Sequence, residues 1–389
     1  MRLALFTSFS PEIGGGSVQL RSHLEQLTDL DVDWYYLAKT PVAGPRRHWL
    51  GEPLTANEFL SDLCARTGFL PGSKSRIRSL VSRMQADLYW VVGHYEGLSV
   101  AAELIDQKKK LHLTVHDDPF GTWKRSELYR MFRPLLQHTF PKILRSAQNI
   151  DVTSWGMRNL YRQKYGVECF SLYRHVVDLP RLNISRDQTR LTIGHIGTLY
   201  QSEPFRQFVD ACKEIAAEQD RALHMIRIGS SLEMDIVAGV DPEIFQAHGD
   251  LAEQDAIPLL AGCDFLYAMY PAGNRFELFR KTSLPIKLST YLQAQRPIFA
   301  HTPPDSTLAC VVNKYRVGRI CGSDRLHQNI ATEVRHLLAQ RVPLENFEHV
   351  RKELMEPWQL QKLRAALHGE NWQHFPEFDC RIEIRLNDD

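Results

Sequence analysis

The chain has 389 residues, more than one ordinary hydrophobic core encloses, so two domains are expected. Its composition is 43% hydrophobic and 24% charged with a net charge of +1, which excludes a nucleic-acid binder that works through bulk basic charge. The seven cysteines are odd in number and form no Cys-x-x-Cys pair, so neither a disulfide framework nor a zinc site is expected, and a reducing cytoplasm fits best.

The N-terminal apolar run, Met1–Phe6, is too short for a signal peptide and gives way to glycines. No stretch approaches the ~20 apolar residues that a membrane span needs. We therefore expect a cytoplasmic protein, either free or lying peripherally on the inner face of the membrane.

The first half of the chain predicts an α/β domain. Met1–Phe6 reads as a strand, Thr7–Gly16 as a glycine-rich loop and Val18–Leu27 as a helix, which is the opening unit of a Rossmann-like domain. Further strands are predicted at Trp34–Ala38, Leu88–Val92, Leu111–Val115 and Ile150–Thr153. Most are short, apolar on both faces and separated by helical segments, which is typical of buried parallel strands.

The same plan returns near the middle of the chain. Arg190–Ile196 reads as a strand, Gly197-Thr198 as a turn and Glu203–Ala217 as a helix. Further strands are predicted at Leu223–Ile228, Asp264–Met269, Pro297–Ala300 and Gly318–Ile320. Two such openings half a chain apart indicate two Rossmann-like domains.

The domain boundaries follow from this repeat. The segment Leu179–Gln188 carries a proline and alternating charge, so we expect it to link the domains. The helical stretch Asn346–Leu367, interrupted at Pro357, leads into a tail without a pattern. The predicted units are an N-terminal acceptor domain at 1–180, a C-terminal donor domain at 181–367 and a tail at 368–389.

Ligands of open parallel sheets bind outside the carboxyl ends of the strands, so the residues that follow each strand are candidates. Gly14, Gly15 and Gly16 follow the first strand and would let the backbone approach a ligand closely; the alternative is a plain flexible turn. The loop lacks both the GxGxxG spacing and a Walker A lysine.

His116 follows the predicted strand Leu111–Val115, where it could hydrogen-bond a polar substrate. The alternative is a histidine satisfied by its neighbours, with Asp117 and Asp118 capping a helix. A metal pair at these aspartates is discounted because no further ligand with suitable spacing is evident.

Lys287 lies just inside a predicted helix within the segment Ser283–His301. A helix N-terminus already carries partial positive charge and unpaired N–H groups, so a cation there is unfavourable unless an anion lies between them. Ser283 and Leu284 offer N–H groups, whereas Pro285 lacks one where its absence costs least. We interpret the segment as a diphosphate site.

Five stretches resemble GT-B glycosyltransferases, most closely the retaining family 4 of nucleotide-sugar-dependent enzymes. They are Pro11–Leu27, Leu113–Asp118, Val152–Gly166, Thr192–Leu199 and Leu284–His301. The resemblance covers roughly Met1 to Leu367. It implies an α/β fold of two Rossmann-like domains whose parallel sheets face each other across a cleft.

The resemblance also implies an activity: transfer of a sugar from a UDP- or GDP-linked nucleotide sugar to a hydroxyl of a glycan or lipid-linked acceptor, with retention and without a metal or other cofactor. His116 and Lys287 are the implied catalytic residues, with His116 against the donor sugar. The implied donor-binding residues are Gly15, Gly16, Thr198, Ser283, Leu284, Ile286 and Thr290, and Arg206 joins them as a replacement for cations that the family carries elsewhere. No nucleic acid is expected as a partner.

Four positions depart from the family pattern. They are Thr282 and Thr290, where relatives carry glutamates, and Thr198 and Glu203, where relatives carry an arginine and a lysine. A threonine can hydrogen-bond a hydroxyl but lacks charge-assisted strength, and Lys287 with Arg206 or Arg280 would have to replace the lost cations. The departures leave open a degenerate, non-catalytic GT-B protein that binds a nucleotide sugar or a partner enzyme. Another GT-B enzyme, such as a nucleotide-sugar epimerase, is a further alternative.

The segment Thr122–Gln148 carries six basic residues against one acidic residue, with apolar residues near helical spacing. One interpretation is a core-packing helix with a basic solvated face. The other is an interfacial helix that brings the enzyme to anionic lipid and a lipid-linked acceptor.

Overall fold

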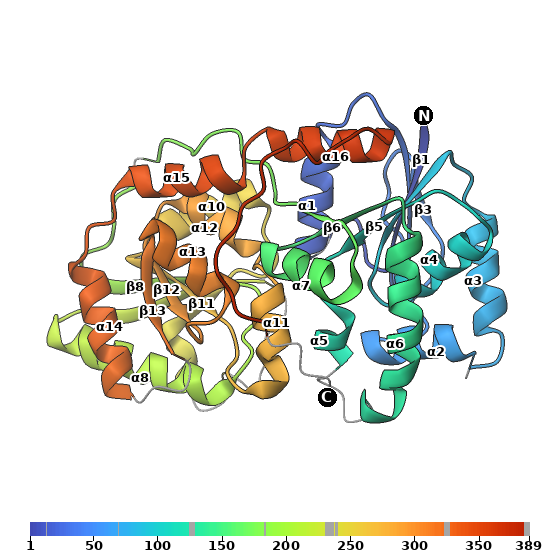
Figure 1. Cartoon of the computed structure of the whole chain (residues 1–389). Coiled ribbons are helices and arrows are strands. Elements are labelled where there is room, and N and C mark those ends of the chain that lie inside the picture. Colours follow the sequence, from blue (N-terminus) through green and yellow to red (C-terminus); the bar gives the residue numbers. More distant parts are fainter. Residues whose placement is uncertain are drawn as a thin grey trace.

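The computed structural model describes residues 1–12, 14–68, 70–123, 129–182, 184–229, 237, 240–322 and 327–384. Its described part forms two α/β domains that lie side by side, each built on its own sheet (Figure 1). The strand pairings of both sheets are parallel, as the buried apolar runs predict. The expectation of two Rossmann-like domains is confirmed.

The first sheet has seven strands in the order β3-β2-β1-β4-β5-β6-β7. They are β1 (Arg2–Thr7), β2 (Asp31–Tyr36), β3 (Arg47–Trp49), β4 (Leu88–Val92), β5 (Leu111–Val115), β6 (Asn149–Val152) and β7 (Phe170–Ser171). The helices between them are α1 (Gly15–Leu24), α2 (Glu58–Thr67), α3 (Ser73–Ser82), α4 (Gly97–Asp106), α5 (Pro119–Trp123), α6 (Tyr129–Ser146) and α7 (Trp155–Tyr165).

The second sheet has six strands in the order β10-β9-β8-β11-β12-β13. They are β8 (Arg190–Ile196), β9 (Ala222–Ile228), β10 (Phe245–Ala247), β11 (Phe265–Met269), β12 (Ile298–His301) and β13 (Gly318–Cys321). The helices are α8 (Ser202–Glu218), α10 (Glu253–Ala261), α11 (Glu277–Thr282), α12 (Lys287–Ala294), α13 (Thr307–Tyr315), α14 (His327–Ala339), α15 (Leu344–Leu354) and α16 (Trp358–His368), with short 3₁₀ turns at Pro242–Ile244 and Asn274–Phe276.

The central strands form because helices cover both of their faces. Every residue of β4, β5 and β11 is buried. β4 and β11 are apolar runs, whereas β5 also buries His112 and Thr114, which are hydrogen-bonded to Asp151. β4, β5 and β8 have the bounds that the sequence predicts. The sequence analysis missed three strands, which have two or three residues each and lie at the sheet edges: β3, β7 and β10.

The last helix of the chain, α16, returns to the first domain. Leu363, Ala366 and Leu367 are buried in one apolar cluster with Leu3 and Leu5 of β1. Figure 1 shows α16 lying beside α1 and the first sheet, whereas α15 lies over the second domain. The helical stretch that the sequence predicts at 346–367 therefore contributes to both domains.

The described part of the tail crosses from the first domain to the second. Glu377 accepts hydrogen bonds from Arg158 of α7 and from Lys362 of α16, at 2.7 and 2.8 Å. Cys380 is joined by a disulfide to Cys310 of α13. The sequence does not predict this pairing, because a tail without apolar periodicity gives no sign that it folds back onto α13.

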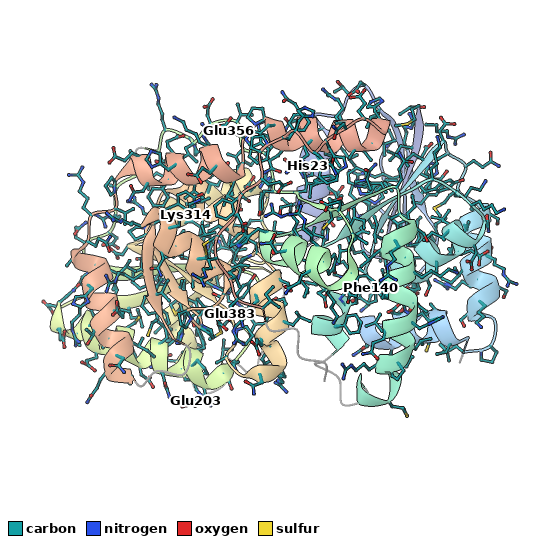
Figure 2. All side chains as sticks on the ribbon, in the orientation of Figure 1. His23, Phe140, Glu203, Lys314, Glu356 and Glu383 are labelled. Atoms are coloured by element: carbon teal, nitrogen blue, oxygen red, sulfur yellow. A yellow bond between two sulfur atoms is a disulfide. The ribbon has the colours of Figure 1, made fainter. Side chains whose placement is uncertain are left out.

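The basic segment 122–148 is largely α6, with residues 124–128 outside the described part. Leu136, Phe140 and Ile143 are buried in the core of the first domain, so the core-packing interpretation holds for these three side chains. Figure 2 labels Phe140 on this helix. Among the described helices, none has the length and apolar character that crossing a membrane requires.

Candidate functional site

A cleft of about 850 Å³ lies between the two domains, within the range of small-molecule sites. Its lining from the first domain includes Glu12, Gly14, Gly15, Arg21, Glu25, His116 and Asp117. Its lining from the second domain includes Gly197, Thr198, Gly229, Asp250, Glu253, Ser283, Leu284, Pro285, Ile286 and Lys287. The candidate residues that follow the strands of both sheets therefore meet in one space, as the strand-end rule predicts.

At the glycine loop that leads into α1, the first domain lies close to the second domain. A Cβ at Gly15 would lie 3.3 Å from Cδ1 of Ile286 in the second domain, and a Cβ at Gly16 would lie 2.9 Å from Cε1 of His116. Gly14 has a φ of 98°, which side chains disfavour. The loop thus needs glycine for its backbone conformation and for its contacts with His116 and Ile286.

His116 lies at the end of β5 with 6% of its surface exposed. Its Nε2 atom has no hydrogen-bond partner among the described residues, and the residue lines the cleft. Burial, together with the positive charge that His94 and His23 would carry, lowers the pKa of His116 to about 3. The ring is therefore neutral at physiological pH and suited to hydrogen-bonding a sugar hydroxyl.

Asp117 and Asp118 have separate roles. Oδ1 of Asp118 accepts hydrogen bonds from the amides of Phe120 and Gly121 at 2.9 and 3.2 Å, so Asp118 caps α5, as one interpretation expected. Asp117 lines the cleft. No group of three or more His, Cys, Asp or Glu residues in the described part is arranged to hold a metal ion.

Hydrogen bonds to the carbonyl group of Ser283 fix the turn that precedes α12. The carbonyl oxygen of Ser283 accepts hydrogen bonds from the hydroxyls of Tyr270, at 3.0 Å, and Thr307. Ser283, Leu284 and Ile286 line the cleft immediately before α12 begins at Lys287. The N-terminus of α12 therefore borders the cleft, where its dipole favours an anion. The amide of Ser283, which the sequence offers as a free N–H group, donates instead to the carbonyl oxygen of Phe279 at 2.9 Å, and the amide of Leu288 donates to that of Pro285 at 2.9 Å.

Lys287 lies over the turn that ends β8. A Cβ at Gly197 would lie 3.8 Å from Nζ of Lys287, and the φ of 77° at Gly197 is one that a side chain would strain. Gly197 in turn touches Gly229, because a Cβ at Gly229 would lie 3.5 Å from Cα of Gly197. The Nζ atom of Lys287 is thus buried beside two glycine turns, while Gly197, Gly229 and Lys287 all contribute to the lining of the cleft.

Thr290 does not line the cleft. Its hydroxyl donates to Oε1 of Glu253 at 2.8 Å, and the side-chain amide of Gln293 donates to the same oxygen at 3.0 Å. Arg174, from the segment that leaves the first domain, pairs with Glu253 as well. A carboxylate therefore does border the cleft on the side of the second domain, and α10 supplies it. Sequence reasoning missed Glu253 and Arg174 because neither lies in a recognisable motif.

Two of the proposed replacement cations, Arg206 and Arg280, do not line the cleft. Arg206 donates to Glu203 at 3.0 Å and is absent from the lining, and Figure 2 shows Glu203 at the lower edge of the second domain. Arg280 forms a two-point ion pair with Asp305, at 2.8 and 2.9 Å. The placement of Arg206 therefore gives no support to its expected role as a donor ligand. The lysine and arginine residues that line the cleft are Arg21, Arg174 and Lys287.

Two Rossmann-like domains with parallel sheets on either side of a cleft define the GT-B fold. Solved structures show the same fold across nearly the whole chain. Sucrose-phosphate synthase from Thermosynechococcus elongatus has a TM-score of 0.66 at 12% identity, over 94% of this chain and 98% of that one.

Two further solved structures have the same fold. The glycosyltransferase WaaG, involved in lipopolysaccharide biosynthesis, has a TM-score of 0.60 at 12% identity, over 94% of this chain and 100% of that one. The E. coli trehalose-6-phosphate structure bound with UDP-2-fluoro glucose has a TM-score of 0.59 at 12% identity, over 98% and 100%. Neither family models nor curated proteins gave a match. At such low identity the comparison establishes the fold alone.

Proposed function

We propose that this protein is a retaining glycosyltransferase that moves a sugar from a nucleotide sugar to a hydroxyl of a glycan or lipid-linked acceptor. One observation carries the proposal: the turn Ser283–Ile286 and Lys287 border the same cleft as Gly15 and His116 of the other domain. An anion-binding helix start on one side and a neutral histidine on the other fit a diphosphate joined to a sugar.

In this reaction, Lys287 and the start of α12 would stabilise the negative charge of the leaving phosphate. As the bond between sugar and diphosphate breaks, negative charge grows on the leaving phosphate, where Lys287 and the amides of the α12 N-terminus can stabilise it. The acceptor hydroxyl attacks from the face that the phosphate leaves, and the departing phosphate oxygen takes its proton. This route needs neither a general base from the protein nor a cofactor besides the nucleotide sugar.

The opposite wall of the cleft would position the sugar. The neutral His116 can share a hydrogen bond with a sugar hydroxyl through Nε2, which has no partner among the described residues. The glycines at 14–16 let the backbone approach the same region without side chains. Closure of the cleft at Gly15 and Ile286 would exclude water, so that transfer outruns hydrolysis.

The nucleotide is proposed to be a uridine or guanosine diphosphate. A solved structure with the same fold binds UDP-2-fluoro glucose, which supports a UDP-sugar as the first donor to test. The acceptor is proposed to bind on the first-domain side. A peripheral contact with anionic lipid through 122–148 would rest on basic residues alone, because Leu136, Phe140 and Ile143 are in the core.

A second candidate is a non-catalytic protein that binds a nucleotide sugar. It is motivated by Thr198 and Glu203, which stand where relatives carry cations, and by the engagement of Arg206 with Glu203 away from the cleft. A nucleotide-sugar epimerase is the third candidate function.

Calorimetric titration with UDP, GDP and other nucleotides, followed by incubation with the matching nucleotide sugars, separates these functions. Binding with donor turnover and a product of unchanged anomeric configuration by NMR supports the transferase. Binding without turnover supports the second candidate, and a changed sugar still linked to its nucleotide supports the third. Failure of every nucleotide to bind would overturn the proposal.

A further inference from the structure

The first domain contacts the turn before α12 through the start of α7. Figure 1 shows α7 and α11 next to each other where the two domains meet. Ser154 lies directly before α7, and its hydroxyl donates a hydrogen bond to the carbonyl oxygen of Thr282 at 2.6 Å. Thr282 is the last residue of α11 and precedes the turn Ser283–Ile286. A first-domain side chain is therefore bonded to the backbone that leads into this turn.

The contact between α7 and α11 is buried and close. Ser154 and Thr282 are both 0% exposed, so water does not compete for their hydrogen bond. A Cβ at Gly156, in the first turn of α7, would overlap the carbonyl oxygen of Lys281, so a larger residue would push the two helices apart. The N-terminus of α7 thus faces the last carbonyl groups of α11, and the partial charges of the two helix ends attract each other.

The hydroxyl of Ser154 forms two hydrogen bonds with different roles. It accepts one from the amide of Met157 at 3.1 Å, which caps α7. It donates the other to Thr282, across the domain boundary. A helix cap needs only an acceptor, whereas the second bond needs a donor on the same atom, which a hydroxyl provides. The bond to Thr282 is therefore more than a requirement of α7.

The bond from Ser154 holds one peptide group at the start of the turn. The carbonyl of Thr282 and the amide of Ser283 belong to the same planar group. That amide donates to the carbonyl oxygen of Phe279 at 2.9 Å, so the plane is held at both of its polar atoms. Loss of the Ser154 hydroxyl would release one of the two and let the plane rotate.

The next peptide group carries an amide that an anion can reach. The carbonyl oxygen of Ser283 accepts from Tyr270 and Thr307. In a trans peptide the N–H points opposite to the C=O, so the amide of Leu284 points away from these two side chains. Leu284 lines the cleft, and its amide forms no hydrogen bond with the residues that the structure describes. Its direction depends on the peptide group before it, which is the one that Ser154 holds.

We propose that Ser154 is a positioning residue for the donor diphosphate. Through Thr282 it orients the turn Ser283–Ile286, so that the amide of Leu284 is aligned with a phosphate oxygen. Alignment matters because a hydrogen bond weakens steeply as its angle departs from linear. Since the hydroxyl belongs to the first domain and the turn to the second, contact between the domains completes the diphosphate site. This inference rests on the proposed function, which assigns the diphosphate to that turn.

Two glycine variants separate the bond to Thr282 from the capping of a helix. Ser154→Gly removes the hydroxyl without adding volume, and glycine keeps most of the capping strength. Asn57→Gly is the matched control: Asn57 is exposed, caps α2 by accepting from the amide of Leu60 at 3.1 Å and does not line the cleft. Ser154→Thr keeps the hydroxyl and should behave as wild type does.

Hydrogen–deuterium exchange of the free protein measures whether the turn is held. The amides of Ser283 and Leu288 are hydrogen-bonded to Phe279 and Pro285, so their exchange reports on the turn. We expect exchange over 283–288 to be about three- to tenfold faster in Ser154→Gly, the range that one hydrogen bond contributes. It should be unchanged in Ser154→Thr and Asn57→Gly. Equal exchange in Ser154→Gly and wild type would overturn the proposal.

Calorimetric titration with UDP and GDP measures the consequence for the donor. The nucleotide that wild type binds more tightly should bind about three- to tenfold more weakly to Ser154→Gly, and as in wild type to Ser154→Thr and Asn57→Gly. Faster exchange without weaker binding, or an equal loss in Asn57→Gly, would overturn the positioning role alone. Failure of wild type to bind any nucleotide would overturn the proposed function, and the positioning role with it.

Discussion

The hydroxyl of Thr290 donates a hydrogen bond to Glu253 at 2.8 Å, which joins α12 to α10 at the edge of the cleft. The resemblance to family 4 places a ribose-binding glutamate at position 290, and this chain has threonine there. The structure nevertheless puts a carboxylate next to that threonine, held by Gln293 and Arg174 as well. The departure at 290 is therefore accompanied by an acidic group from another helix.

We predict that Glu253 binds the hydroxyls of the nucleotide ribose. Glu253→Gln should weaken binding of the nucleoside diphosphate by ~10- to 100-fold, since hydrogen bonds to a charged group contribute about 1.5–3 kcal/mol. Calorimetry with the nucleoside diphosphate and with pyrophosphate measures this. Pyrophosphate has no ribose, so its affinity should stay unchanged; equal losses for both ligands would mean that Glu253 acts on the phosphate site or on the fold.

Lys287→Ala should slow the chemical step. If Lys287 is a principal stabiliser of the leaving phosphate, its loss costs on the order of 2–4 kcal/mol of transition-state stabilisation, or roughly 30- to 1,000-fold in kcat. Steady-state kinetics with saturating donor measures the effect, and Lys213→Ala, an exposed lysine of α8, is the control. Activity within twofold of wild type in Lys287→Ala would show that Lys287 has no such role.

Gly16→Ala should disturb the cleft through His116. The added methyl would lie 2.9 Å from the imidazole, so the ring must shift or the loop must move. We expect reduced kcat/KM together with a modest loss of stability. A double-mutant cycle with His116→Ala identifies the cause: in the absence of the ring, the stability cost of Gly16→Ala should largely disappear. Additive costs would mean that another contact of Gly16, such as that with Phe9, is responsible.

His23 makes the fold sensitive to acid. It is fully buried on α1, where Figure 2 labels it, and both ring nitrogens are without partners among the described residues. Burial, helped by the nearby charge of Arg174, lowers its pKa to about 3. The unfolded chain therefore binds this proton more readily, so stability is complete above the unfolded pKa of ~6.5 and is lost as the pH falls below it.

The size of this effect is measurable. One such histidine lowers the free energy of unfolding by about 2 kcal/mol between pH 7 and pH 5. Urea unfolding at both pH values measures this change in the free energy of unfolding. In His23→Met, which places an apolar side chain of comparable size there, the change should be smaller than in wild type by about 2 kcal/mol. An unchanged pH dependence in a folded His23→Met variant would show that His23 titrates normally.

The disulfide between Cys310 and Cys380 should stabilise the tail. It joins residues 70 positions apart, and closing a loop of that length contributes up to about 4 kcal/mol in the chain-entropy description. Under oxidising conditions, Cys310→Ser, Cys380→Ser and the double variant should all lose the same free energy of unfolding. Additive losses for the two single variants would show that the cysteines act separately.

The sequence predicts most of the fold because helices cover both faces of each sheet. Apolar runs such as Leu88–Val92 then appear without interruption, and their ends mark the strands directly. Short strands such as β3 and β7 lack that signal, since two or three residues show no period. The return of α16 to the first sheet and the course of the tail depend on contacts between distant segments, which no local pattern encodes.

The candidate site was predictable where a backbone requirement shapes the sequence. Gly15, Gly16 and the turn before Lys287 stand out because glycine, proline and a lysine at a helix start each have a physical reason. Glu253, Arg174 and Arg21 do not, because a charged residue on a helix or in a loop is ordinary until the fold places it in a cleft. Arg206 shows the opposite error. Its charge and its place in the sequence suit a donor ligand, but in the structure it donates a hydrogen bond to Glu203 and does not line the cleft.

The most direct test is a crystal structure of the protein with the nucleoside diphosphate that binds most tightly. The account predicts the diphosphate within hydrogen-bonding distance of the backbone amides at the start of α12 and of Nζ of Lys287, with Gly15 and His116 facing it. A diphosphate bound elsewhere in the cleft, or a Lys287 side chain directed away from it, would contradict the account.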